Sequence, residues 1–312
     1  MRKLQVIFGT GPLGSSVAEE LLRLGYPVRM INRSGRASVQ GAEIVAGDAC
    51  SLDFTRRVTE NAAVVYQCAQ PAYHRWAEEF PALQQSILEG AAANQAKLVI
   101  ADNLYMYGDP QGQTIRETSP ENPHTKKGKV RKAMAEAALA AHQAGRLQVA
   151  LSRPSHYFGS GYEVTGNMVF KNALRGKAMQ FLGRLDQPHS FSFVPDAGKA
   201  MAVLGMSEQS WGQVWIPPVQ PAQTQTEFAQ KIWQAAGQSE TPKVQALGGF
   251  LAQIAGLFVP TIRETVEMMY EFEKPYVVSS AKFEQTFGIR ATPTDEAIRR
   301  TLEHYRLAVP VI

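Results

Sequence analysis

Two segments of the chain carry residues whose types and spacing could do chemistry. One is the glycine-rich stretch GTGPLG at positions 9–14, and the other is the basic run NPHTKKGKVR at positions 122–131. Backbone N–H groups of a glycine-rich loop can bind phosphate. Clustered lysines and arginines can bind a polyanion, or one of them can serve an active site while the others are solvated. Which interpretation applies depends on the elements that position these residues.

The glycine-rich stretch has the flanks that dinucleotide binding requires. It directly follows the apolar run LQVIF and precedes the helix-like run SSVAEELL. In this context Gly9 permits a tight turn, Gly11 lets a pyrophosphate approach the backbone, and Gly14 lets the helix pack against the strand. The alternative is an ordinary strand-to-helix turn. We predict a phosphate-binding loop made of Gly9, Thr10, Gly11, Pro12, Leu13 and Gly14.

The end of the second apolar run indicates which dinucleotide is bound. An NAD site usually carries Asp or Glu there to accept from the ribose 2′-OH, whereas this chain has Asn32 followed by Arg33. A guanidinium can pair with a 2′-phosphate and stack on adenine. We therefore predict NADP(H), with NAD as the less favoured cofactor and a solvated Arg33 as the alternative. Asp48, after the third run, could accept from the adenine amino group or cap the next helix.

Short apolar runs alternate with helix-period segments through the first half of the chain. This pattern is typical of a parallel sheet covered by helices on both faces. After Pro154 the pattern changes, and from Thr226 it is mostly helical, including the apolar run ALGGFLAQIAGLF. We predict an α/β fold with a Rossmann-type doubly wound parallel sheet of seven strands and a smaller, mainly helical C-terminal part. The expected domains are a cofactor-binding core of residues 1–155, to which 191–218 returns, and a substrate-binding part of 156–190 and 219–312.

Composition excludes several classes of protein. The 312 residues are 45% hydrophobic and carry a net charge of +4, which describes an ordinary globular protein without the basic stripe of a nucleic-acid binder. Cys50 and Cys68 cannot form a disulfide framework and favour a reducing compartment. We found no signal peptide, no membrane span and no spacing for a metal site. A cytoplasmic protein is expected, with the run LGGFLAQIAGLFVP as a buried helix.

Taken in order, the segments resemble the extended short-chain dehydrogenase/reductase superfamily, which includes nucleotide-sugar epimerases and dehydratases. The resemblance covers essentially the full length and rests on GTGPLG, GDACSLD, VYQCAQP, DNLYMYG, RPSHYFGSG and SFVPDAGKAM. It implies an NAD(P) site to which further residues contribute from the ends of the fourth and sixth strands and from the helix after the fifth strand. These residues are Ala69, Gln70, Lys129, Pro154 and Ser155.

The resemblance also implies a catalytic set, but two of its three members are replaced. The family uses a Ser or Thr, a Tyr, and a Lys four residues after the Tyr. Here Lys129 stands at the lysine position, Thr125 at the tyrosine position and Asn103 at the serine position. A threonine hydroxyl is a poor proton shuttle near neutral pH. Asn103 can still orient a carbonyl, and Lys129 can bind the ribose. The other cations of the run, Lys126, Lys127, Arg131 and Lys132, are interpreted as solvated.

Other side chains could supply the missing proton donor. Tyr73, which follows the fourth strand, is our candidate, with a surface aromatic as the alternative. For Tyr105 and Tyr107 core packing is favoured, and for His156 a structural hydrogen bond. We expect an NADP(H)-dependent oxidoreductase or epimerase/dehydratase-like enzyme acting on a carbonyl/alcohol or sugar-like substrate. The alternative is a catalytically silent NADP(H)-binding redox sensor or regulatory protein, which the missing tyrosine favours. The alanine-rich face of KVRKAMAEAALAAH would also permit a homodimer.

Overall fold

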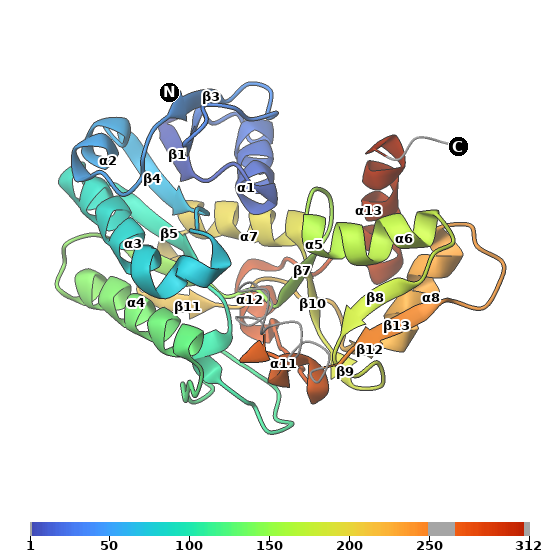
Figure 1. Cartoon of the computed structure of the whole chain (residues 1–312). Helices are drawn as coiled ribbons and strands as arrows, with labels where there is room; N and C mark the ends of the chain where they lie inside the picture. The colour runs from blue at the N-terminus through green and yellow to red at the C-terminus, as the bar shows by residue number, and fades with distance from the viewer. Residues whose placement is uncertain (1, 249–265, 309–312) are drawn as a thin grey trace. The chain divides into compact units, whose positions relative to one another are not determined.

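A computed structural model describes residues 2–248 and 266–308 of the chain. They form two compact units, each built from several segments (Figure 1). Unit 1 comprises residues 1–106, 126–154 and 195–217, and unit 2 comprises residues 107–125, 155–194 and 218–312. Most of the apolar run predicted to be a buried helix lies outside the described residues.

Unit 1 is built on a seven-stranded sheet in the order β11-β6-β5-β4-β1-β2-β3. All six pairings are parallel, which confirms the predicted Rossmann-type sheet. The strands are β1 (Leu4–Phe8), β2 (Val28–Asn32), β3 (Glu43–Ala46), β4 (Ala62–Gln67), β5 (Lys97–Ala101), β6 (Val149–Ser152) and β11 (Gln213–Trp215).

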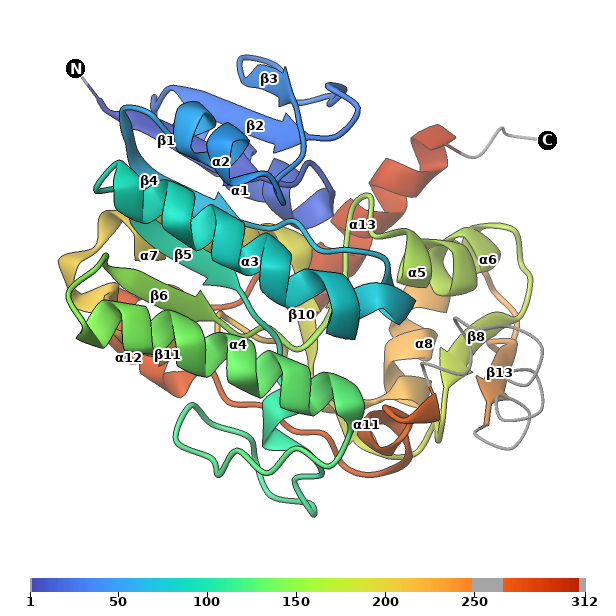
Figure 2. The same ribbon diagram turned by 60° about the vertical axis from the view of Figure 1, so that its left-hand side comes forward.

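Helices cover both faces of this sheet. They are α1 (Pro12–Arg23), α2 (Leu52–Val58), α3 (Trp76–Ala93), α4 (Lys126–Gln143) and α7 (Val194–Met206). In Figure 2, α3 and α4 cross one face, with α7 behind the sheet. Two glycines of α7 allow its close packing: a Cβ on Gly198 would meet Ser16 of α1, and one on Gly205 would meet Tyr66 of β4.

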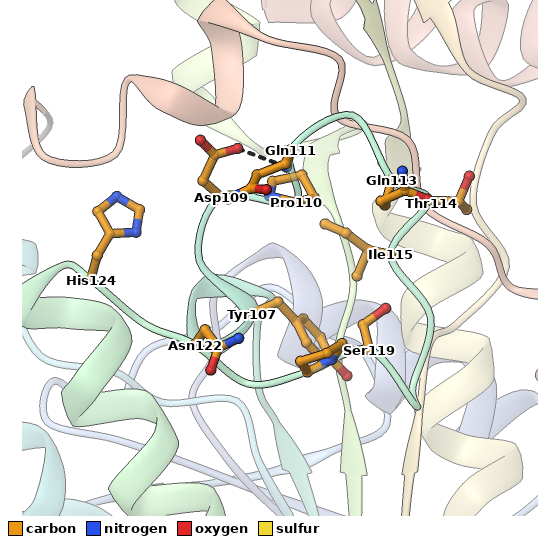
Figure 3. A pocket seen from close by; sticks show the side chains of 11 residues that line it. Tyr107, Asp109, Pro110, Gln111, Gln113, Thr114, Ile115, Ser119, Asn122 and His124 are labelled. Atoms are coloured by element: carbon orange, nitrogen blue, oxygen red, sulfur yellow. Dashed lines mark hydrogen bonds between the residues drawn. The ribbon is translucent and has the colours of Figure 1, made fainter.

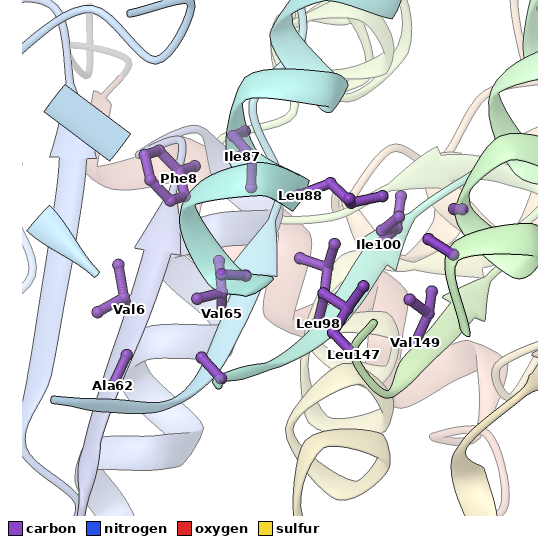
Figure 4. Packing of buried hydrophobic residues seen from close by; sticks show 14 of the residues in the cluster. Val6, Phe8, Ala62, Val65, Ile87, Leu88, Leu98, Ile100, Leu147 and Val149 are labelled. Carbon is purple, nitrogen blue, oxygen red and sulfur yellow. The ribbon is translucent and has the colours of Figure 1, made fainter. Parts of the chain in front are cut away.

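The main core lies between the sheet and the α2–α4 layer. Val65 of β4, Leu98 of β5 and Val149 of β6 are fully buried and pack with Ile87 and Leu88 of α3 (Figure 4). Strands buried on both faces must be apolar along their length, which is why these runs were recognisable in the sequence. The strand order reverses between β1 and β4. Sheets of this kind bind ligands at such a reversal, outside the carboxyl ends of the strands.

Unit 2 contains short strand pairs and helices. Its strands are β7 (His156–Phe158) with β10 (Phe191–Phe193), β8 (Met179–Leu182) with β13 (Val244–Leu247), and β9 (Pro188–His189) with β12 (Gln223–Thr224). Its helices are α5 (Glu163–Thr165), α6 (Lys171–Leu174), α8 (Gln225–Ala235), α11 (Tyr270–Glu273), α12 (Ala281–Phe287) and α13 (Thr294–Ala308). Aromatic side chains such as Phe158, Phe170 and Trp233 fill its core. A capping box between Thr224 and Glu227 begins α8.

Candidate functional site

The glycine loop between β1 and α1 is closed at two positions and open at a third. Gly9 has φ +103°, and a Cβ there would lie 2.7 Å from the backbone nitrogen of Ala69. A Cβ on Gly14 would lie 2.1 Å from the carbonyl oxygen of Gly9. At Gly11 a Cβ would meet no described protein atom within 4 Å. The loop therefore packs tightly where the fold needs it and leaves space where a pyrophosphate would approach.

The start of α1 adds to this arrangement. Gly11 is the N-cap residue and Pro12 is the first helical residue, and no side chain caps this end. The first N–H groups of a helix lack intrahelical acceptors and carry partial positive charge, which favours an anion. These residues fit a dinucleotide.

Asn32 links the glycine loop to the segment after β2. Its Nδ2 donates to Thr10 Oγ1 at 2.6 Å and to the carbonyl of Arg36 at 2.5 Å. Its Oδ1 accepts from the Gly35 backbone N–H at 2.6 Å. The amide thus holds the turn on which Arg33, an exposed residue, lies beside the glycine loop. Asn32 contributes to this region as a scaffold for Arg33.

Asp48 does not cap the helix that follows it, so that alternative is wrong. Its Oδ1 accepts from the Cys50 N–H at 3.0 Å. Helix α2 begins after Ser51, whose side chain accepts from the Phe54 N–H. Ser51 is one residue closer to the first turn than Cys50, which gives its hydroxyl the N-cap geometry. A contact of Asp48 with adenine stays a prediction.

The remaining predicted cofactor residues follow β4 and β6. Ala69 lies against Gly9, and Gln70 is exposed. Pro154 is buried in unit 1. Ser155 belongs to unit 2. Its backbone N–H donates to Ser192 Oγ at 2.9 Å, and its hydroxyl donates to the carbonyl oxygen of Ser190 at 2.7 Å. Their contacts with a cofactor stay predictions.

The lysine and arginine that helix α4 buries were interpreted from the sequence as solvated. Lys127 and Arg131 are each only 2% exposed, so the interpretation of these two as solvated is wrong. Lys129 is exposed, as is Lys126. Thr125, at the position expected for tyrosine, is buried directly before the helix. The buried positions of α4 recur with helical spacing, and Lys127 and Arg131 begin that face. Their i, i+4 spacing ahead of the buried alanines was the signal that sequence analysis missed.

A buried ionic network lies at the ends of β5 and β6. Both oxygens of Asp102 are used: Arg131 Nε donates to Oδ1 at 3.0 Å, and Arg153 Nε donates to Oδ2 at 2.8 Å. Arg131 also donates to the carbonyl of Ala101 at 3.1 Å. Its guanidinium lies 4.6 Å from the centroid of the Phe80 ring. The network ties α4 to the carboxyl end of β5. Asp102 and Arg153 could have been found as charged residues directly after two neighbouring buried strands.

Asn103 and Tyr73 lie on the same edge of the sheet. The Oδ1 of Asn103 accepts from the Tyr105 N–H at 3.1 Å, so this carbonyl shapes the turn after β5. Tyr73 is half-buried. Its hydroxyl donates to the Tyr105 hydroxyl at 3.3 Å, and its ring packs edge-on against Trp76. The ammonium of Lys127 lies 4.5 Å from the centroid of the Tyr73 ring.

Comparison with known proteins agrees with this geometry. Residues 6–212 match the NAD dependent epimerase/dehydratase family. The chain belongs to this family. The predicted superfamily is thereby confirmed, as is the expectation of an enzyme of the epimerase/dehydratase type.

Solved structures share the fold of this epimerase/dehydratase family member over nearly its whole length. UDP-glucose 4-epimerase from Thermotoga maritima, solved with UDP-glucose, has a TM-score of 0.78 and 15% identity, with 98% of this chain and 99% of that chain covered. dTDP-glucose 4,6-dehydratase from Bacillus anthracis, in complex with NAD, has a TM-score of 0.79 and 16% identity, with 97% and 96% covered. UDP-glucose 4-epimerase from Thermus thermophilus, in complex with NAD, has a TM-score of 0.77 and 19% identity, with 98% and 100% covered. No curated protein matched the sequence.

The Cys68 thiol and the grouping of metal-binding side chains are two further features of the described residues. Burial raises the pKa of the Cys68 thiol to about 12, so Cys68 is un-ionised at neutral pH. Within residues 2–248 and 266–308, no three His, Cys, Asp or Glu side chains are grouped to hold a metal ion. Over the same ranges, no helix has the length and apolar character to cross a bilayer.

A pocket of about 590 Å³, lined by both polar and apolar side chains, lies in the 107–124 segment of unit 2. Figure 3 shows Asp109 and Gln111 on one side, with Tyr107, Ser119 and Asn122 on the other. The Asp109 carboxylate accepts from the Gln111 N–H at 2.9 Å and also forms an ion pair with Lys274. Amide, hydroxyl and carboxylate groups of this kind can exchange hydrogen bonds with a hydroxylated ligand.

His156 is half-buried and belongs to a polar cluster of unit 2. Its Nδ1 shares a 2.9 Å hydrogen bond with His189 Nε2, and its Nε2 lies 3.2 Å from Glu271 Oε2. The hydroxyl of Tyr276 donates to Glu271 Oε1 at 2.8 Å. Both ring nitrogens of His156 are engaged by other side chains of unit 2, and its role as a structural hydrogen-bond partner stays a prediction. Burial, followed by the neighbouring His156, holds the pKa of His189 well below its usual value.

We expect His189 to make the stability of the protein depend on pH. The folded chain keeps His189 neutral, whereas the unfolded chain protonates it below about pH 6.5. The unfolded state therefore binds more protons as the pH falls, and the free energy of unfolding drops by up to about 1.4 kcal/mol per pH unit. Urea denaturation between about pH 5 and 7 should show a flatter slope for His189→Phe than for wild type. His304→Gln, at an exposed position of α13, is the control and should keep the wild-type slope. An unchanged slope in His189→Phe would contradict the prediction.

Proposed function

We propose that this protein is an NADP(H)-dependent oxidoreductase or epimerase/dehydratase-like enzyme that acts on a carbonyl/alcohol pair of a sugar-like substrate. The observation that carries the proposal is the glycine loop, which is open at Gly11 and joined through Asn32 to the turn of Arg33. The family is described as NAD dependent, and the NAD complexes of two structural neighbours favour that cofactor. The exposed arginine after β2 is our reason to propose NADP(H).

We assign separate cofactor-binding and catalytic roles to residues that follow the strands of the sheet. The glycine loop and the start of α1 bind the pyrophosphate, and Arg33 pairs with the 2′-phosphate. When bound, the nicotinamide donates or accepts the hydride. The amide nitrogen of Asn103 donates to the substrate carbonyl, since its Oδ1 is used by the Tyr105 N–H. Tyr73 is the proposed proton donor.

A hydroxylated substrate is supported by two observations. The Thermotoga maritima epimerase structure contains UDP-glucose, and the pocket of the 107–124 segment is lined by side chains that exchange hydrogen bonds with hydroxyl groups. The second candidate function is a silent NADP(H)-binding sensor, which Thr125 favours because it occupies the position expected for the family tyrosine. Turnover of any carbonyl substrate would exclude this second candidate.

The cofactor proposal is tested by titrating the purified protein with NADPH and NADH and following nucleotide fluorescence. We expect NADPH to bind at least about tenfold more tightly than NADH. Arg33→Asp should weaken NADPH binding by about 10–100-fold, since a hydrogen bond to a charged group contributes about 1.5–3 kcal/mol.

Arg36→Asp is the matched control. Arg36 is also exposed, and its backbone carbonyl, rather than its side chain, holds the loop. This variant should retain more affinity for NADPH than Arg33→Asp. If the wild type bound NADH more tightly than NADPH, the proposed cofactor would be NAD rather than NADP. Binding of neither nucleotide would overturn the proposed function as a whole.

A further inference from the structure

We propose that Tyr73 and Lys127 form the proton-transfer pair of this enzyme. A tyrosine from the segment after β4 and a lysine from the inner face of α4 would then do what a tyrosine and lysine of a single helix were expected to do. This inference rests on the proposed function for its chemistry, but its geometry lies entirely within unit 1.

The helical repeat of α4 selects Lys127 over Lys129. Residues two positions apart differ by about 200° around a helix, so these side chains leave from nearly opposite faces. Lys127 shares its face with Arg131, and both are 2% exposed. Lys129 is exposed. Only one of the two lysines can therefore face the sheet edge, and the packing assigns Lys127.

The Asp102 network fixes this rotation of the helix. Arg131, one turn after Lys127, binds both the Asp102 carboxylate and the Ala101 carbonyl at the end of β5. Arg153 binds the other oxygen of Asp102 from the end of β6. A rotation that exposed Lys127 would also break a buried ion pair. Arg131 is thus a positioning residue that keeps Lys127 turned inward.

The contacts of Tyr73 with Lys127 and Tyr105 would stabilise its ionised form. The Lys127 ammonium lies 4.5 Å from the centroid of the Tyr73 ring, and the Tyr73 hydroxyl is 3.3 Å from that of Tyr105. Trp76 packs edge-on against the same ring, with centroids 5.0 Å apart, and is itself buried. In a partly dry environment, a cation packed against the ring of a phenol stabilises negative charge on the phenol oxygen much more than it would in water.

In the proposed step Tyr73 exchanges a proton with the substrate oxygen while the hydride moves between the substrate carbon and the cofactor. In the reducing direction the substrate carbonyl carbon gains the hydride that the bound cofactor supplies. The Tyr73 O–H bond breaks, and its proton passes to the substrate oxygen to complete the alcohol. The phenolate that is left carries one negative charge, which the Lys127 ammonium and the Tyr105 hydroxyl stabilise. A proton from solvent restores Tyr73. In the oxidising direction the phenolate takes the alcohol proton, and the hydride leaves the same carbon for the oxidised cofactor.

The coupling between the two side chains can be measured without substrate or cofactor. The alkaline absorbance titration of the full chain, minus that of Tyr73→Phe, reports the ionisation of Tyr73. In Lys127→Met the pH midpoint of this difference should rise by about one unit or more, because an opposite charge close to an ionising group shifts its titration by about one to three units. Lys129→Met is the matched control on the opposite face. Its midpoint should move much less, since solvent and salt screen an exposed charge.

Lys127→Arg separates loss of charge from loss of packing and should keep the midpoint closer to wild type than Lys127→Met does. It also keeps the test available if Lys127→Met does not fold. An unchanged midpoint in Lys127→Met would overturn the pairing, as would equal shifts in both methionine variants. If only Lys127→Arg folds, a rise of its Tyr73 pH midpoint by as much as about one unit would also overturn the pairing. A wild type that binds neither NADPH nor NADH would refute the proposed function, while the Tyr73 titration would still report on the pair.

Discussion

Replacing Asp102 with alanine should lower the free energy of unfolding by about 3–5 kcal/mol, which is a large fraction of the stability of most proteins. The Asp102 side chain is 2% exposed, and so is that of Arg131, while that of Arg153 is 1% exposed. Removing the carboxylate leaves two buried guanidinium groups facing each other without the anion that separates them. The loss is therefore dominated by uncompensated buried charge rather than by the attraction of the ion pairs themselves.

Urea denaturation followed by tryptophan fluorescence measures this loss, with Glu136→Ala as the control. Glu136 also pairs with a cation of α4, Lys132, but at 3.9 Å and with its side chain 63% exposed. An exposed pair of this kind contributes less than about 1 kcal/mol, so the control should unfold near the wild-type urea concentration. If Asp102→Ala cost no more than Glu136→Ala, the network would not hold α4 to β5. Our explanation for the orientation of Lys127 would then lose its support.

The sheet and the glycine loop were predictable because their determinants are local in sequence. A buried strand must be apolar along its length, and GTGPLG lies between such a strand and a helix start. The replacement of an acidic residue by Asn32 and Arg33 could likewise be seen at the end of the second strand. The structure added that the Asn32 amide joins this turn to Thr10, a contact between two loops that no spacing in the sequence encodes.

The candidate catalytic residues were harder to predict because they depend on contacts between distant segments. Counting four residues from a tyrosine position led to Thr125 and Lys129, whereas burial favours Lys127 over Lys129. The sequence shows several lysines in a row, and only the packing of α4 on Asp102 decides which one turns inward. The proximity of Tyr73 to Lys127 depends in the same way on how the segment after β4 packs against the start of α4.

Gly11→Ala should abolish most nucleotide binding while leaving the fold intact. The φ of Gly11 is −71°, which alanine adopts freely, and its Cβ would meet no described protein atom within 4 Å. The weaker N-cap preference of alanine and the lower entropy of the unfolded chain offset each other, so we expect a stability change within about 1 kcal/mol. The new methyl group would occupy the space through which a pyrophosphate approaches the backbone. NADPH affinity should fall at least about tenfold, a loss of about 1.4 kcal/mol or more.

Gly14→Ala is the comparison that separates the two roles of glycine in this loop. Its Cβ would lie 2.1 Å from the carbonyl oxygen of Gly9, so the strand-to-helix turn itself must move. This variant should lose both thermal stability and NADPH binding, whereas Gly11→Ala should lose binding alone. Thermal denaturation and fluorescence titration of both variants measure the difference. If Gly11→Ala bound NADPH as tightly as wild type, the pyrophosphate would not lie against this residue, and the open space at Gly11 would have to be explained by the fold alone.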